Sequence, residues 1–142
     1  MVTIDRRLLI LSLQLLRHLT LDVGLQMVWY LPRKAQIRSG HALLHALVVS
    51  SFTAPIYLLL LQRPLTSKLL LRIVGAQALE LVTHTIIDVS KSLYRLSHKD
   101  KLKKPFNNLR LQAVDQSLHM LIIILGWRLV CVSLSDEKEQ NA

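Results

Sequence analysis

Cysteine, aromatic residues and charged residues are all scarce in this sequence. The single cysteine, Cys131, excludes an intrachain disulfide, so the fold does not depend on covalent cross-links. Only 5% of the residues are aromatic and 19% are charged, and the charges cluster so that long stretches contain almost none. A soluble domain of 142 residues needs charged side chains over its whole surface. The scarcity of charge therefore favours lipid as the surrounding medium.

The net charge of +9 is not accompanied by a nucleic-acid-binding motif or by a basic face interleaved with aromatic residues. Most Lys and Arg residues lie between apolar segments or at their edges. Positive flanks of membrane spans account for this distribution. We therefore do not expect nucleic acid as a partner.

Four long apolar segments cover residues 8–31, 41–61, 69–96 and 111–134. About 20 helical residues, rising 1.5 Å each, cross a hydrocarbon core of roughly 30 Å. No small-residue cleavage site follows the first segment, which we expect to be a retained helix. Short connections favour an up-down arrangement, and Pro55 predicts a kink in the second span. The sequence predicts an all-α, polytopic membrane protein: one domain (1–142) of about four transmembrane helices in an up-down bundle.

A pair of His or Asp residues spaced four apart recurs in every predicted span. The four pairs are His18–Asp22, His41–His45, His84–Asp88 and Asp115–His119. Residues four apart lie on one helix face, one turn above each other. In an up-down bundle, the later halves of spans one and three lie beside the earlier halves of spans two and four. All four pairs are therefore expected at one depth, as a single polar layer.

The chemistry of this layer is that of a metal site, because imidazole nitrogen and carboxylate oxygen are ligands for Zn²⁺, Fe²⁺ and Mn²⁺. Eight candidate ligands predict one or two divalent transition-metal ions, with zinc favoured. Two ions and three aspartates leave one positive charge, which a bridging hydroxide would cancel. The alternative is a metal-free polar or proton-conducting network, since intramembrane His and Asp also hydrogen-bond between helices. For His41, near the end of its span, contact with headgroups and water is a further alternative.

Two more residues follow the same helical stripes. Glu80 precedes His84 by four positions, and Lys91 follows Asp88 by three. Both are candidate catalytic residues. Glu80 is interpreted as a general base, a further ligand or a structural partner of the ligands. Lys91 is interpreted as a residue that stabilises an anion, although snorkelling to the membrane interface is the favoured alternative.

The segments HLTLDVGLQ, GHALLHAL, THTIIDVSK and DQSLHM, in this order, resemble the small bacterial and phage membrane proteins grouped as domain of unknown function 3307. Members show a His–Asp helix running into Gln, then HALLHA, then a His–Asp–Lys segment, then Asp-Gln-x-x-His. The resemblance covers about residues 18–119. Val23, Gly24 and Val89 depart from residues that are commoner in the group, without touching a candidate ligand. The family implies no activity, and the layout is also similar to small membrane proteins classed as metal-dependent hydrolases.

These expectations combine into two functional hypotheses for an integral membrane protein, placed by the resemblance in the bacterial inner membrane. The favoured one is metal binding, extending to metal-dependent hydrolysis of an ester or phosphoester in a lipid-like substrate. The alternative is a non-enzymatic membrane protein, which handles ions or protons or binds a partner. Membrane lipid is the expected partner, and a second copy of the chain or another membrane protein is left open.

Basic residues are unevenly divided between the two sides of the predicted bundle. The first and third loops carry nine, against five on the opposite side, or seven with Arg72 and Arg128. The bias predicts that the loop at 97–108 is cytoplasmic and both termini are external. Cysteines placed at Ser97 and Ser135, with Cys131 replaced, test this with an impermeant thiol reagent on intact cells. The Ser135 variant should react and the Ser97 variant should not; the reverse pattern would overturn the orientation.

Overall fold

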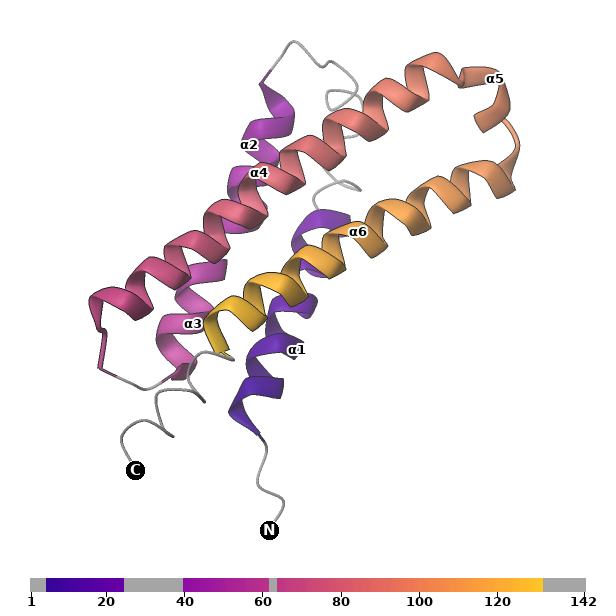
Figure 1. Ribbon diagram of the computed structural model, residues 1–142. Helices are drawn as coiled ribbons and strands as arrows, with labels where there is room; N and C mark the ends of the chain where they lie inside the picture. The colour runs from indigo at the N-terminus through magenta and orange to yellow at the C-terminus, as the bar shows by residue number, and fades with distance from the viewer. Residues whose placement is uncertain (1–4, 25–39, 62–63, 132–142) are drawn as a thin grey trace.

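The computed structural model describes residues 5–24, 40–61 and 64–131, and for His41 the backbone alone. All regular structure in these ranges is helical. The elements in chain order are α1 (Arg6–His18), the π-helix η1 (Leu19–Val23), α2 (His41–Ser51), α3 (Thr53–Leu61), α4 (Ser67–Ser97), the short α5 (Lys99–Leu102) and α6 (Pro105–Cys131). Figure 1 shows α4 and α6 antiparallel and joined through α5, with α1, α2 and α3 beside them.

Three of these stretches are long and apolar enough to cross a membrane. They are Ala42–Leu61, Ser67–Ser97 and Pro105–Cys131. Within the described part of the chain, α1 and η1 do not meet the same criteria. Residues 25–31 of the predicted first span and 132–134 of the predicted fourth lie outside the described residues. The all-helical prediction is confirmed, and three potential spans are found where about four were predicted.

Burial in this bundle is inverted relative to a water-soluble fold. Thirteen polar or charged side chains are buried among the described residues, against ten apolar ones. Large apolar side chains instead line the outside of every long helix, as Leu59 and Leu71 do at 75% and 73% exposure. Water-soluble proteins bury apolar residues and leave Asp, Glu, Lys and Arg exposed. An apolar exterior around a polar interior is the distribution that a hydrocarbon solvent demands.

Two local irregularities shape the inner face of the bundle. The segment 41–61 is broken at Phe52, where α2 ends and α3 begins, three residues before Pro55. Proline has no backbone N–H and clashes with the preceding turn, which explains the break predicted at this position. The second irregularity, the π-helix η1, follows α1 directly and contains Asp22. Single π-turns within α-helices are found frequently at functional sites.

The two longest helices approach closely where a glycine faces a small residue. A Cβ added at Gly126 on α6 would lie 3.5 Å from the Cβ of Ala76 on α4. Small residues at such contacts let helix backbones pack tightly in a membrane. α6 begins at Pro105, six residues earlier than predicted, and proline suits the first turn of a helix because no N–H is needed there.

The contact between Gly126 and Ala76 predicts a graded response to side-chain size. Gly126→Ala should be tolerated, whereas Gly126→Leu forces α4 and α6 apart and should lower stability by about 1–3 kcal/mol, as overpacking does. Thermal unfolding in detergent measures this. Gly75→Leu is the control, because its Cβ meets only the flexible Leu129 side chain at 3.8 Å. Equal stability of the two leucine variants would contradict the packing described here.

Candidate metal centre

Seven of the eight predicted ligands meet in the middle of the bundle. Each is at most 3% exposed: His18, Asp22, His45, His84, Asp88, Asp115 and His119. They come from α1, η1, α2, α4 and α6, and neither α3 nor the short α5 contributes a ligand to the predicted polar layer. The side chain of His41, the eighth, lies outside what the structure describes. His98, which has no partner at the predicted spacing, lies outside the cluster and stacks on Tyr94 at 4.3 Å between ring centroids.

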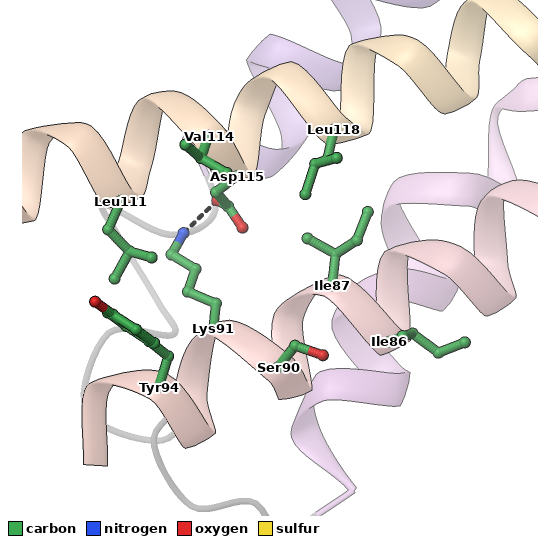
Figure 2. Close-up of a pocket in the computed structure, with 9 residues that line it drawn as sticks. All are labelled: Ile86, Ile87, Ser90, Lys91, Tyr94, Leu111, Val114, Asp115 and Leu118. Atoms are coloured by element: carbon green, nitrogen blue, oxygen red, sulfur yellow. Dashed lines mark hydrogen bonds and ion pairs between the residues drawn. The ribbon is translucent and has the colours of Figure 1, made fainter. Parts of the chain in front are cut away.

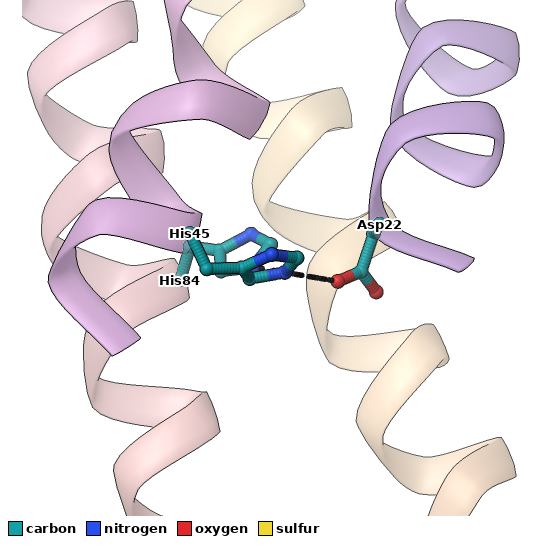
Figure 3. A group of neighbouring side chains, drawn as sticks. All are labelled: Asp22, His45 and His84. Carbon is teal, nitrogen blue, oxygen red and sulfur yellow. Dashed lines mark hydrogen bonds and ion pairs between the residues drawn. The ribbon is translucent and has the colours of Figure 1, made fainter. Parts of the chain in front are cut away.

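Asp22 lies at the junction of the cluster. Its Oδ1 is 2.7 Å from His45 Nε2, a hydrogen bond, and 3.6 Å from His84 Nε2. Figure 3 shows both imidazole rings on the side of Asp22 that carries this oxygen. The Nε2 of His18 approaches Oδ2 of the same carboxylate at 3.8 Å. Asp22 therefore faces three histidines from three separate segments.

Asp88 and Asp115 extend the cluster toward α6. His84 Nε2 is 3.5 Å from Asp88 Oδ2, and His119 Nε2 is 4.0 Å from Asp88 Oδ1. His119 Nε2 also lies 3.7 Å from Asp115 Oδ1. The rings of His84 and His119 are 4.1 Å apart between centroids, which makes them the closest histidine pair in the cluster.

These separations suit metal ligands better than hydrogen bonds. Several imidazole and carboxylate atoms lie 3.5–4.0 Å apart, beyond hydrogen-bonding range. Two ligands of a tetrahedral zinc ion, each about 2.0–2.1 Å from it, are about 3.3–3.4 Å apart. Three sets of ligand atoms lie within 4.8 Å of one another: Asp22, His45 and His84; His84, Asp88 and His119; and Asp22, Asp115 and His119.

Buried ring nitrogens provide a second indication that the cluster fits a cation. Both ring nitrogens of His18, both of His84, and Nε2 of His119 have no hydrogen-bond partner among the described residues. A buried polar atom without a partner costs about 1–3 kcal/mol, so folded proteins rarely keep several in one place. Coordination to an ion would satisfy one ring nitrogen each of His84 and His119, which belong to the ligand sets; His18 belongs to none of them. The donor set is imidazole and carboxylate only, which suits divalent transition metals.

A family model described as protein of unknown function (DUF3307) matches residues 10–141. The chain belongs to this family. The match includes all of the buried His and Asp residues of the cluster, and the predicted resemblance is confirmed. No curated protein and no solved structure matches the chain. The family description names no activity, so the chemistry of the DUF3307 site has to be argued from its geometry.

Lys91 belongs to the cluster, and the expectation that it snorkels to the interface is wrong. It is 8% exposed and forms an ion pair with Asp115, as Figure 2 shows. With neutral histidines, Asp22, Asp88 and Asp115 carry three negative charges, which Lys91 reduces to two. One divalent ion then balances the site. Two ions would leave two positive charges, rather than the one expected before Lys91 was placed.

Glu80 lies one turn from His84, in a separate ion pair. Its Oε1 accepts a hydrogen bond from Arg17 at 2.6 Å, and its Oε2 accepts one from the Thr53 hydroxyl at 2.5 Å. Arg17 also donates to the Val49 carbonyl near the helix break and to Gln14. These bonds occupy both oxygens, which supports the interpretation of Glu80 as a structural partner. Its role as a general base stays a prediction.

Arg17 and Gln116 are site residues that the sequence analysis missed. Gln116 donates from Nε2 to Asp22 Oδ2 at 2.7 Å, and so links α6 to η1. Its position directly after Asp115, in the Asp-Gln-x-x-His segment, could have indicated that Gln116 belongs to the site. Arg17 directly precedes His18 and follows Gln14 by three residues, a polar run that a lipid-facing helix would not carry.

A cavity of about 420 Å³ opens between α4 and α6 beside the cluster. Its walls are mostly apolar, and the Lys91–Asp115 ion pair lies between the two helices in its lining (Figure 2). This cavity leaves the Lys91–Asp115 pair accessible from the side of the bundle. Tyr94, Leu111 and Val114 line its outer end.

Because Arg17 and Glu80 form a buried ion pair, substituting Arg17 alone should lower stability more than substituting both residues. The side chains are only 6% and 7% exposed, so Arg17→Met leaves a buried charge on Glu80 uncompensated. Loss of one partner of a buried pair costs about 3–5 kcal/mol. The double variant Arg17→Met/Glu80→Met should recover much of this loss in thermal unfolding measurements. Arg128→Met, at an exposed arginine of α6, is the control and should change stability little. Additive losses in the double variant would contradict the pairing.

Proposed function

We propose that this protein is a membrane-embedded metalloprotein that hydrolyses an ester or phosphoester bond in a lipid-like substrate. The observation that carries the proposal is the convergence of buried His and Asp side chains, in which ring nitrogens of His18, His84 and His119 have no hydrogen-bond partner among the described residues. The charge balance with Lys91 favours one divalent ion in the resting site. Zinc suits the mixture of nitrogen and oxygen ligands.

Membrane insertion is the first part of this proposal. The exposed apolar surface and the three potential spans support it. We further propose that the chain from α1 through the residues beyond η1 forms a fourth span, as its apolar sequence over 8–31 indicates. The bacterial and phage resemblance supports the further proposal that this membrane is the bacterial inner membrane.

Hydrolysis is the second part. A divalent ion in such a site supplies an activated water and polarises a carbonyl or phosphoryl oxygen. The oxygen of a water molecule would bond to the carbonyl carbon or phosphorus, the ester bond would break, and the departing oxygen would take up the proton that the water loses. Lys91 lines the cavity and carries the positive charge that would stabilise negative charge on the reacting group. Asp115, which forms an ion pair with Lys91, would carry a proton from the attacking water to the departing oxygen.

The competing function is transport of ions or protons along a metal-free polar network. The Arg17–Glu80 pair favours it, because the pair extends the polar column beyond His84. The column then meets a cluster of buried apolar residues at the opposite end of the described bundle: Ile10, Tyr57, Leu69, Ile73, Ala76, Val130 and Cys131. A conduit for ions or protons needs polar groups that reach both faces of the membrane. The apolar cluster therefore favours a binding site that opens to one side over a conduit.

The proposal predicts stoichiometric metal in the purified protein. Metal analysis should find about one transition-metal ion per chain, most often zinc. His84→Ala and Asp22→Asn should lower this content sharply, because each residue belongs to two of the three ligand sets. His45→Ala and Asp115→Asn should lower it less steeply, since each belongs to one set.

His98→Ala is the control, since it removes a half-buried histidine that lies outside the cluster, stacked on Tyr94, and should leave the metal content unchanged. Glu80→Gln should also keep its metal, and loss of metal in that variant would identify Glu80 as a ligand. Folded wild-type protein that contains no metal, or that keeps full activity after chelation, would overturn the metal site. Hydrolysis would then lose its basis as well.

A further inference from the structure

The cavity beside the cluster is the inner half of a longer groove. A second cavity of about 450 Å³ lies next to it, toward the turn formed by α5. The two cavities share three lining residues, Tyr94, Leu111 and Val114. A single groove therefore runs between α4 and α6, from Ile86 and Leu118 past the Lys91–Asp115 pair to the basic end of the bundle.

The two halves of this groove differ in chemistry. Ile86, Ile87 and Leu118 line the inner half, where an apolar chain would be accommodated. Lys101, Asn107 and Arg110 line the outer half, which is polar and positively charged. An apolar trough that ends in a basic pocket matches a molecule with the opposite arrangement, an apolar chain joined to an anionic head.

The basic residues of the outer half are available to a ligand. Lys101 and Arg110 make no ion pair within the described residues, whereas Lys103, in the same turn, pairs with Asp100 at 2.8 Å. The Asn107 side chain donates to the Lys101 carbonyl at 2.8 Å and so ties the α5 turn to the start of α6. The guanidinium of Arg110 lies 5.8 Å from the Phe106 ring.

The spacing along α6 places the reacting group of such a molecule at the cluster. Arg110 precedes Asp115 by five residues, which corresponds to about 7–8 Å along the helix axis. This is the depth by which ester groups lie below the phosphate in a bilayer leaflet, to within a few Å. The basic pocket is also at the helix ends, where the headgroup region of a membrane would lie.

We propose that this groove binds an anionic phospholipid, with its phosphate at Lys101 and Arg110 and an acyl chain along Ile86, Ile87 and Leu118. The ester linkage then lies beside Lys91 and Asp115, next to the metal ligands. The inference rests on the proposed function for its catalytic meaning, since it names the substrate class of the same site. Binding itself requires only the groove, and can be measured without metal or turnover.

Native mass spectrometry of the purified protein with added phosphatidylglycerol or phosphatidylcholine tests the inference. The wild-type chain should bind phosphatidylglycerol in preference. The double variant Lys101→Gln/Arg110→Gln should weaken that binding by roughly tenfold or more, since each basic contact contributes about 1 kcal/mol. Lys99→Gln/Lys103→Gln is the control, because it removes the same amount of charge from the nearby α5 turn, at residues that do not line the groove.

Three results would overturn the groove as a lipid site. They are equal binding of the two lipids, equal weakening by the two double variants, which would indicate a general basic surface, and unchanged binding when Leu118→Trp fills the apolar half. The metal site is tested separately. Both double variants should keep their metal content, and the metal-depleted His84→Ala variant should still bind phosphatidylglycerol. Binding of intact lipid without hydrolysis would sustain the groove and contradict the proposed hydrolase.

Discussion

Burial of charge in an apolar bundle is the constraint on which the rest of this structure depends. Three aspartates lie at most 3% exposed at the centre of helices whose outer surfaces are apolar. An unpaired carboxylate in such a place would cost many kcal/mol, so positive charge has to be supplied within the bundle. Lys91 supplies one unit through Asp115. Two units remain, and a divalent ion among the histidines is the compensation that the donor set fits.

The polar interior has two layers, the His–Asp cluster and the Arg17–Glu80 ion pair, and they have different roles. The His–Asp cluster has incompletely satisfied nitrogens and a groove at its side, whereas the Arg17–Glu80 pair is internally satisfied. Arg17 reaches the carbonyl of Val49 beside the break at Phe52, and so holds α1 against α2 and α4. Arg17 directly precedes His18, and Glu80 lies one helical turn before His84. The Arg17–Glu80 pair therefore positions both histidines. Below it, apolar packing around Ile10 and Ile73 closes the bundle.

Much of this arrangement follows from helical spacing, and the parts that do not follow have identifiable reasons. Pairs four residues apart predicted the shared faces of His18–Asp22, His84–Asp88 and Asp115–His119, because that spacing is intrinsic to a helix. Arg17 was not predicted as a site residue, and Lys91 was expected to reach the membrane interface. Both long side chains instead reach partners on other helices, which the spacing within one helix does not specify. The π-helix at Asp22 has no signature in the apolar pattern, and the side chain of His41 lies outside the described residues.

The most direct test is an experimental structure of the protein purified without chelator, with anomalous scattering measured on both sides of the zinc absorption edge. The account predicts one strong anomalous peak within about 2.0–2.2 Å of imidazole and carboxylate atoms from the set of Asp22, His45, His84, Asp88, Asp115 and His119. A map without a peak, in which the His84 and His119 rings have closed onto the carboxylates at hydrogen-bonding distance, would contradict it.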